Sequence, residues 1–531
     1  MIRRWKKVLI AVLFMAGLLT LRVGKITLSP DFPLAASRME YHLQLLSERG
    51  DILDRNGEKL INETEEFLYL LLPRDSSAES LLASGIPFSY DDLMSAYASF
   101  RPAIARSKIL FPKTPDVTVY PSFIRYQKDQ IAAQLIGYLD ETGHGISGLE
   151  YYLNDLLYQG GNQIALSYQA NALGGLRMDQ TPIIEQTLGK SSVTLTLDKN
   201  MQKKAEELLK EAGVTGCVVV SDCKTGELLA LASAPTFSPL FLSEALASED
   251  GPFQQRYFQA YDAGSIFKLV TAAAALEMGY NEEETGYCGS YYESNGQRIA
   301  CSNRYGHGTI TMEEAFASSC NPYFCALAEK VGAKKLLSMA QACSLGQYSE
   351  LLPGFSAAAG NLPTESQLQN ATSLAMLGFG QGNLQVTPLQ MATLVGAVAN
   401  GGIRKMPILI DSYRDKDGRI TENIPTEGIR IFSEETAKKL QKMMVLAVNE
   451  GSGQLAGSSL FASGGKTGTA ETGWVTDKGE TMVHGWFVGF FPADNPTYAI
   501  VVFCEDGKSG AEIAAPIFKE LSEWIFLREQ K

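Results

Sequence analysis

Between residues 264 and 274 the chain reads GSIFKLVTAAA, which is a glycine and a serine followed by an apolar helical pattern. A spacing of three places Ser265 and Lys268 on the same face of the first helical turn. The start of a helix favours developing negative charge on such a serine. Lys268 can act as its base only when uncharged, which requires burial or a second nearby cation to lower its pKa. This motif alone leaves open an N-cap serine beside a solvated lysine.

Two other S-x-x-K pairs occur, at Ser221/Lys224 and Ser463/Lys466. Only Ser265 both follows a glycine and opens an apolar helix. We therefore interpret Ser265 as the candidate nucleophile and the other two serines as incidental matches.

The triplet Ser319-Cys320-Asn321 is the only S-x-N in the chain. Alternate positions on a tight turn can direct a hydroxyl and an amide toward one point, where the hydroxyl relays a proton and the amide holds a substrate backbone group. The alternative is an ordinary helix cap or turn.

Residues 464–470 read GGKTGTA and enter a predicted strand. Glycines on both sides allow a ligand backbone to lie close along that strand. Lys466, Thr467 and Thr469 offer a cation and hydroxyls for a substrate carboxylate. A second K-T-G at 224–226 is followed by Glu227 between two strands, and we predict a plain turn there. A phosphate-binding loop is excluded because Leu460 stands where its first glycine is required.

The composition changes near Ser191, and strand patterns follow at both ends of the remaining sequence. Strands are predicted at 193–197, 217–221, 227–233, 468–471, 485–491 and 498–504, and helices at 199–212, at 265–278 and around Ile517, Leu521, Trp524 and Ile525. Asp198 is the expected N-cap of the first helix. The middle, about 279–460, is predicted to be mostly helical. This order predicts an α+β fold, an α/β sandwich in which helices cover one antiparallel sheet.

The order S-x-x-K, S-x-N, K-T-G, with these contexts, is hard to obtain by chance. The chain resembles a class B penicillin-binding protein, a monofunctional peptidoglycan D,D-transpeptidase. Further segments that carry the resemblance are 49–57, 145–150, 193–198, 225–235, 380–382 and 387–390. The resemblance implies a cytoplasmic tip with a transmembrane signal anchor at 1–25, an extended mixed α/β support domain of the dimerisation type at 26–190 and a transpeptidase domain at 191–531.

The same resemblance implies a role for each motif residue. Ser265 attacks the carbonyl between the two terminal D-alanines of a peptidoglycan stem peptide, Lys268 is the general base, and Lys466 helps to keep Lys268 neutral. Ser319 carries a proton to the leaving D-alanine. The implied substrate-binding residues are Asn321, Thr467, Gly468 and Thr469, and the backbone N–H groups of Ser265 and Thr469 form the oxyanion hole. No metal or organic cofactor is implied.

The implied partners are the stem peptides, β-lactams that trap Ser265, the membrane and a polytopic glycan polymerase. A β-lactamase shares the fold and two motifs, but we identify no base that would activate water for deacylation. A β-lactam sensor would need further membrane spans and a cytoplasmic signalling region. A catalytically silent scaffold is disfavoured by the intact motifs.

The N-terminus predicts an uncleaved signal anchor. An apolar stretch from Val8 to Leu19, extended to Leu21, follows four basic residues, and no A-x-A cleavage pattern comes after it. The excess of positive charge before the stretch favours a cytoplasmic N-terminus with the bulk of the chain outside. A buried core helix is the less favoured alternative.

The 531 residues carry a formal net charge of -13, which disfavours nucleic acid as a partner. The eight cysteines lack C-x-x-C spacing and the four histidines are far apart, so no zinc site is predicted. Cys288 and Cys301 flank a glycine-containing turn. Two interpretations stay open for this pair, namely free thiols or a hairpin disulfide.

Overall fold

The computed structural model describes residues 2–28, 40–74, 76–112, 114–170, 175–177, 181–424, 427–475, 481–505 and 509–530. The chain folds as two compact units, each assembled from several stretches. The first unit comprises Met1–Arg49, Thr64–Ile124 and Gln159–Lys190, and the second comprises Gly50–Glu63, Arg125–Tyr158 and Ser191–Lys531. The division into 1–25, 26–190 and 191–531 stays a prediction.

The first unit contains two three-stranded antiparallel sheets, ordered β1-β6-β7 and β4-β3-β5. Alternate residues of β3 face different cores, as the two-residue period of a strand requires: Tyr69 and Leu71 pack with helices α3 and α4, whereas Leu68 and Leu70 pack with β1 and β6. Its sheet and helix bounds are β1 (Glu40–Ser47), β3 (Thr64–Leu71), α3 (Ala78–Ala83), α4 (Tyr90–Ser99), β4 (Ala103–Ser107), β5 (Val117–Ile124), β6 (Gln163–Gln169) and β7 (Ile183–Thr187).

Helix α1 (Ile2–Thr27) contains the predicted apolar segment. Its Trp5–Ile26 stretch is 22 residues long, apolar and entirely unburied within the chain. A helix needs about 20 apolar residues to cross a bilayer, so α1 is long enough for a single span. The helix extends beyond the predicted stretch from Val8 to Leu21 at both ends, to Ile2 and to Thr27.

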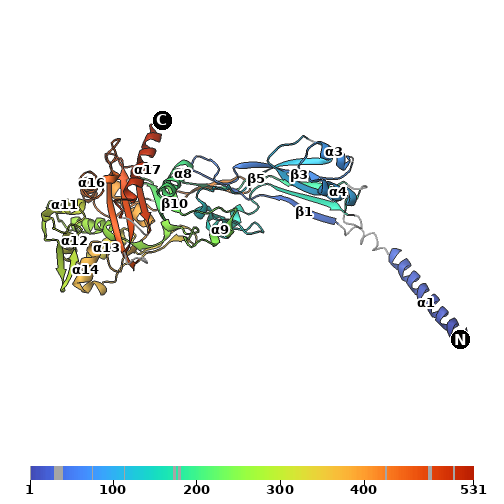
Figure 1. The fold of residues 1–531 in the computed structure, drawn as a ribbon, viewed down its shortest axis with the longest axis horizontal. Helices are drawn as coiled ribbons and strands as arrows, with labels where there is room; N and C mark the ends of the chain where they lie inside the picture. Colours follow the sequence, from blue (N-terminus) through green and yellow to red (C-terminus); the bar gives the residue numbers. More distant parts are fainter. Residues whose placement is uncertain are drawn as a thin grey trace. The chain divides into compact units, whose positions relative to one another are not determined.

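The second unit is built on a five-stranded antiparallel sheet ordered β10-β9-β25-β24-β23, with β23 at one edge. Strands β9 and β10 come from its first half and the other three from its end, which confirms the predicted α+β architecture (Figure 1). The bounds are β9 (Gly216–Asp222), β10 (Leu228–Ala234), β23 (Gly464–Val475), β24 (Thr481–Phe491) and β25 (Tyr498–Cys504).

Helices cover both faces of this sheet. Val218 and Val220 of β9 pack with α8 (Lys199–Ala212) and α17 (Ala514–Glu529). Cys217 and Val219 face the core formed with α10 (Lys268–Glu277), α15 (Pro388–Ala399) and α16 (Glu434–Asn449). Helix α8 begins where predicted, because the Asp198 carboxylate accepts hydrogen bonds from the N–H groups of its first turn. The sheet is therefore the middle of three layers, with helices packed on each of its faces.

Helices form the smaller part of residues 279–460, so the prediction that this middle part is mostly helical was wrong. Several of its strands have four residues or fewer, which is too short for a periodic pattern to be visible in the sequence. The other helices and strands of the whole second unit are β2 (Asp51–Leu53), α5 (Ala133–Ile136), α6 (Gly148–Tyr152), α7 (Asn154–Leu157), β8 (Ser192–Leu195), α9 (Leu242–Leu246), η1 (Arg256–Phe258), β11 (Tyr261–Asp262), η2 (Gly264–Phe267), α10 (Lys268–Glu277), β12 (Thr285–Cys288), β13 (Tyr291–Ser294), β14 (Gln297–Ala300), β15 (Gly308–Thr311), α11 (Met312–Ala317), α12 (Asn321–Val331), α13 (Ala333–Ala342), β16 (Ser349–Leu352), β17 (Phe355–Ala357), η3 (Gln367–Gln369), α14 (Ala371–Gly378), β18 (Gln385–Val386), α15 (Pro388–Ala399), β19 (Ile403–Arg404), β20 (Ile410–Arg414), β21 (Ile420–Glu422), β22 (Ile429–Arg430), α16 (Glu434–Asn449) and η4 (Gln454–Ala456).

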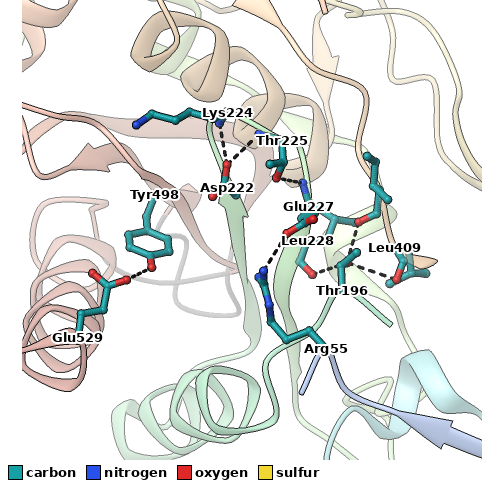
Figure 2. Close-up of polar contacts among 11 residues, drawn as sticks. Arg55, Thr196, Asp222, Lys224, Thr225, Glu227, Leu228, Leu409, Tyr498 and Glu529 are labelled. Carbon is teal, nitrogen blue, oxygen red and sulfur yellow. Dashed lines mark hydrogen bonds and ion pairs between the residues drawn. The ribbon is translucent and has the colours of Figure 1, made fainter. Parts of the chain in front are cut away.

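The first K-T-G copy is the predicted turn between β9 and β10. The Asp222 carboxylate accepts hydrogen bonds from the N–H groups of Lys224 and Thr225, each at 2.8 Å, and the Thr225 hydroxyl accepts from the N–H of Glu227 (Figure 2). An aspartate that bonds the backbone two and three residues ahead is a common way to close a turn. The Glu227 carboxylate then pairs with Arg55 at 3.0 Å.

Candidate active site

Ser265 lies in the 3-10 turn η2, which leads directly into the buried helix α10. The predicted helix 265–278 therefore begins with one tighter turn. Gly264 has φ +59, a conformation that favours glycine. Ser265 is partly exposed in this turn, whereas the next two residues, Ile266 and Phe267, are buried.

The glycine-containing segment 380–382 packs against the turn that carries Ser265. The N–H of Gly264 donates to the Gly380 carbonyl at 2.9 Å, and a Cβ added to Gly380 would come within 1.8 Å of the Gly264 carbonyl oxygen. A Cβ on Gly264 itself would come within 2.7 Å of the Thr469 carbonyl oxygen of β23. Only glycine allows backbones this close, so the turn that carries Ser265 is held between two segments.

Lys268 directs its amine at Ser265. Its Nζ lies 3.0 Å from Ser265 Oγ, 2.8 Å and 3.1 Å from the carbonyl and hydroxyl oxygens of Ser319, and 2.8 Å from the Asn321 side-chain oxygen. An ammonium has three protons and these are four oxygens. A neutral amine also makes three contacts, by donating twice and accepting the proton of the Ser265 hydroxyl, so the arrangement fits a lysine that acts as a base.

The S-x-N triplet connects α11 to α12. Ser319 has φ +57, which is uncommon for a residue with a side chain and turns its hydroxyl toward the lysines. Asn321 is the first residue of α12, where its side-chain oxygen accepts from Lys268 and its Nδ2 donates to the Ala300 carbonyl at 3.2 Å. The predicted convergence of hydroxyl and amide is present.

Lys466 enters from β23 on the other side of Ser319. Its Nζ lies 3.0 Å from Ser319 Oγ, so this one hydroxyl contacts both lysine amines. Both lysine side chains are fully buried. The amines of Lys268 and Lys466 each lie over a phenylalanine ring, Phe324 and Phe316 respectively.

Burial sets the charge of these amines. It lowers the pKa of Lys268 to about 7, against the opposing effect of the nearby thiols of Cys320, Cys325 and Cys301. Burial, followed by the charge of Lys268, lowers the pKa of Lys466 well below its usual range. Two buried cations that share one hydroxyl disfavour each other, so a neutral base is available near neutral pH.

The remaining predicted residues lie along β23. Thr467 is buried with its hydroxyl 2.8 Å from Ser452 Oγ, and Thr469 is exposed. A Cβ on Gly468 would come within 2.9 Å of Ile266 Cγ2 in the turn that carries Ser265. Ser452 was missed by the sequence analysis, since it belongs to no motif and reaches the site only because the loop after α16 folds back to Ala317.

Comparison with known proteins agrees with this geometry. Residues 216–523 match the family described as the penicillin binding protein transpeptidase domain, and that span is more than half of the 531 residues. The chain belongs to this penicillin-binding protein family. PbpB of Mycolicibacterium smegmatis is 31% identical over 466 residues, covering 80% of this chain and 68% of the relative. The peptidoglycan D,D-transpeptidase PbpA of the same organism is 32% identical over 356 residues, covering 61% of this chain and 70% of the relative.

Solved penicillin-binding proteins share the fold. Penicillin binding protein 3 of Mycobacterium tuberculosis superimposes with a TM-score of 0.67 at 26% identity, covering 92% of this chain and 97% of that one. A second structure of that protein holds ampicillin and is similar to this chain at 25% identity, with coverages of 92% and 96%. The resemblance to class B penicillin-binding proteins is confirmed.

A group of potential metal ligands lies beside the S-x-N turn of this penicillin-binding protein. Ligand atoms of Cys288, Cys301, His307 and Cys320 all lie within 4.8 Å of one another. No zinc site is predicted from the sequence, since C-x-x-C spacing is absent and the histidines are far apart, whereas the fold brings together ligands from separate turns. Cys288 and Cys301 are free thiols in the structure, and their disulfide stays a prediction.

Proposed function

We propose that this penicillin-binding protein is a peptidoglycan D,D-transpeptidase that cross-links stem peptides through an acyl-enzyme on Ser265 and binds penicillin at the same oxygen. The observation that carries the assignment of Ser265 is the 3.0 Å separation between its Oγ and the fully buried amine of Lys268, whose pKa is lowered to about 7. A hydroxyl in contact with an uncharged amine can lose its proton as it attacks a carbonyl.

Acylation begins when the Ser265 proton moves to Lys268 Nζ while Oγ bonds to the carbonyl carbon of the penultimate D-alanine. The backbone N–H groups of Ser265 and Thr469 stabilise the resulting oxyanion. Support for this pair comes from the close approach of the turn that carries Ser265 to Thr469 at Gly264. Losing one such donor in other enzymes reduces the rate about 10²–10³-fold.

Collapse of the tetrahedral intermediate breaks the C–N bond to the terminal D-alanine. The leaving amine takes a proton from the Ser319 hydroxyl, which contacts both Lys268 and Lys466 and can be reprotonated by either. An amine from a neighbouring stem then attacks the acyl-enzyme, gives its proton back along the same route and releases Ser265. One peptide bond is broken and one is formed, so no cofactor or energy source is consumed.

The substrate backbone is held by groups on both sides of Ser265. Asn321 binds its amide, and Thr467, Gly468 and Thr469 bind the terminal carboxylate end along β23. The Thr467 hydroxyl is oriented by Ser452, and Thr469 is exposed toward solvent, as a substrate contact requires. Lys466, which lies on the same strand, adds positive potential near the carboxylate only when it is protonated, and its burial opposes that charge.

Fluorescent penicillin tests the assignment of the nucleophile. The purified full-length protein is expected to become labelled at one site and to keep the label, and Ser265→Ala is expected to abolish labelling. Ser221→Ala is the matched control, because Ser221 begins another S-x-x-K whose lysine is exposed at the first K-T-G turn. That control should label like the unchanged protein.

Two results would contradict the proposal. Labelling of Ser265→Ala at the normal level would remove Ser265 as the nucleophile. Rapid release of hydrolysed penicillin by the unchanged protein would favour a β-lactamase, the second candidate considered from the sequence. Exchange of the terminal D-alanine of a synthetic stem peptide for a labelled D-amino acid measures transpeptidation directly.

Placement in the cell follows from α1. We propose that Trp5–Ile26 spans the plasma membrane once, with the basic N-terminus in the cytoplasm and the catalytic unit outside, where peptidoglycan lies. A polytopic glycan polymerase is the proposed partner, since cross-linking acts on newly polymerised strands. A reporter fused before α1 should be protected from external protease in spheroplasts, and accessibility of that reporter would contradict the orientation.

A further inference from the structure

The cluster of Cys288, Cys301, His307 and Cys320 has the composition of a closed metal site. We propose that these four side chains bind one zinc ion. Three thiolates and one imidazole are a ligand set that zinc takes in structural sites, with four protein ligands in a tetrahedron and no position left for substrate. The site goes beyond the proposed transpeptidation and does not depend on it, because metal content is measured without substrate.

The distances need only a small contraction to reach that geometry. Zinc–sulfur bonds of about 2.3 Å place neighbouring ligand atoms roughly 3.8 Å apart in a tetrahedron. The four ligand atoms already lie within 4.8 Å of one another, and Cys301 Sγ is 3.4 Å from His307 Nδ1. The three sulfurs are buried and the imidazole is partly exposed, which leaves the ion a route of entry.

Backbone hydrogen bonds hold the ligands in place. Cys288 ends β12, and its carbonyl accepts from the N–H of His307 at 3.1 Å. The N–H of Cys301 donates to the carbonyl of Ser290 at 2.8 Å. These bonds cross-link the turns that carry three of the four ligands, so the site is largely formed before the ion arrives.

The segment 285–311 has a small core of its own and packs on the main core through the partly buried side chains of Tyr292, Ile299 and Ile310. It forms two two-stranded sheets, β12 with β15 and β13 with β14, and such pairs are marginally stable in water. Its buried residues are Cys288, Ser294 and Cys301, so two of the three are proposed ligands. A segment with so small an apolar core commonly depends on a metal or a disulfide.

The fourth ligand links this segment to the catalytic residues. Cys320 stands between Ser319 and Asn321, and its sulfur is fully buried. Asn321 Nδ2 also donates to the Ala300 carbonyl, next to Cys301. The ion would thus fix the middle residue of the S-x-N turn to the small sheets, which makes Cys320 a positioning residue for the hydroxyl and amide on either side of it.

Binding needs no oxidant or reductant. Three S–H bonds break, three protons pass to solvent, and three sulfur–zinc bonds and one nitrogen–zinc bond form. A disulfide between Cys288 and Cys301 would consume two ligands and leave Cys320 and His307 without a role. The metal and the disulfide are therefore mutually exclusive, and one experiment distinguishes them.

The test uses the full-length protein purified in detergent from cells grown with zinc. Elemental analysis is expected to find about one zinc ion per chain. After chelation, addition of Co²⁺ is expected to restore a thiolate-to-metal charge-transfer absorption. Removal of the metal should slow penicillin acylation by about tenfold, and zinc should restore the rate.

Variants locate the ion. Cys288→Ser and His307→Ala should lose the metal and the cobalt absorption, whereas Cys343→Ser, a buried cysteine outside the cluster, should keep both. If the ligand variants fail to fold, the cobalt titration of the chelated unchanged protein still decides. The proposal is overturned by absence of both zinc and cobalt absorption in the unchanged protein, by unchanged binding in both ligand variants, or by an intact mass with a Cys288–Cys301 disulfide.

Discussion

The triplet Lys-Thr-Gly occurs twice in the second unit and has two different structures. At 224–226 it forms a turn whose backbone N–H groups are bound by Asp222 (Figure 2). The Lys224 side chain is exposed, with its Nζ 3.3 Å from the Asn495 side-chain oxygen. At 466–468 it is extended, paired residue by residue with β24, and the Lys466 side chain is fully buried.

The neighbours of the triplet decide the outcome. An aspartate two residues before the first lysine offers the backbone a turn in place of a ladder. Two glycines before the second lysine leave room for the rings of Phe487 and Phe490, which pack against Gly465 and Gly464. The same three residues therefore form an exposed turn at 224–226 and a buried part of β23 at 466–468. The partner of the backbone N–H groups and the burial of the lysine side chain differ between the two copies.

Substitution of the lysine in each Lys-Thr-Gly copy should give the largest difference in acylation rate between the two copies. Lys466→Met is expected to slow penicillin acylation by about 10²–10⁴-fold, because the Ser319 hydroxyl loses one of the two amines that it contacts. Lys224→Met should change the rate by no more than about twofold. Rates come from time courses of fluorescent labelling. Equal effects of the two substitutions would remove the distinction.

The pH dependence of acylation reports the buried lysines. Lys268 has a pKa lowered to about 7, and only its neutral form accepts the Ser265 proton. The rate should therefore fall about tenfold for each pH unit below that value and level off above it. Lys224→Met should follow the same curve, since its amine is outside the site. A flat profile across pH 7 would contradict the role of Lys268.

Alanine substitutions of Gly468 and Gly226, the glycines of the two Lys-Thr-Gly copies, should affect different properties of the protein. In Gly468→Ala the new Cβ would lie 2.9 Å from Ile266 Cγ2, forcing β23 away from the turn that carries Ser265, and acylation per folded molecule should fall about tenfold or more. In Gly226→Ala the residue must keep φ +84 with a Cβ 2.4 Å from the Met406 carbonyl oxygen. That variant should lose about 1–3 kcal/mol of unfolding free energy and keep its acylation rate.

Thermal unfolding and labelling of the same samples distinguish these outcomes. A stable but slow Gly468→Ala beside an unstable but active Gly226→Ala is the expected pattern. The reverse pattern would show that the first copy, not the second, borders the chemistry.

The smallest effect is expected at the Asp222 carboxylate. Asp222→Ala removes the acceptor of two backbone hydrogen bonds in the turn, which should lower the unfolding free energy by about 1–2 kcal/mol. Acylation should stay unchanged, because the turn is apart from Ser265. Asp222→Asn, which keeps one acceptor oxygen, should recover part of the loss. A change in acylation without a change in stability would contradict this account.

Much of the second unit could be predicted from local signals. Asp198 identified the start of α8, and short runs of apolar residues located β9, β10, β24 and β25. The three motifs identified residues that the structure brings into contact, namely Ser265, Lys268, Ser319, Asn321 and Lys466. Each of these signals lies within a few residues of its consequence.

The rest depended on contacts between distant positions. Ser452 reaches Thr467, and Gly380 supports Gly264, but no spacing in the sequence reveals either pair. The thiols and imidazole of the proposed zinc site stand 13, 6 and 13 residues apart, so neither C-x-x-C spacing nor neighbouring histidines indicated them. Short strands such as β12 and β14 carry too few residues for periodicity to separate them from turns.

The position of β23 at the edge of the five-stranded sheet has one further consequence. An edge strand is a template on which another backbone can pair, and soluble proteins commonly blunt such edges. Here the edge runs past Ser265, so a peptide that pairs with it must itself be extended. The backbone conformation of a peptide therefore decides whether it can pair with β23. A coiled or helical peptide has no row of backbone N–H and C=O groups that matches the strand. Only an extended peptide can pair with β23 and bring its carbonyl close to Ser265.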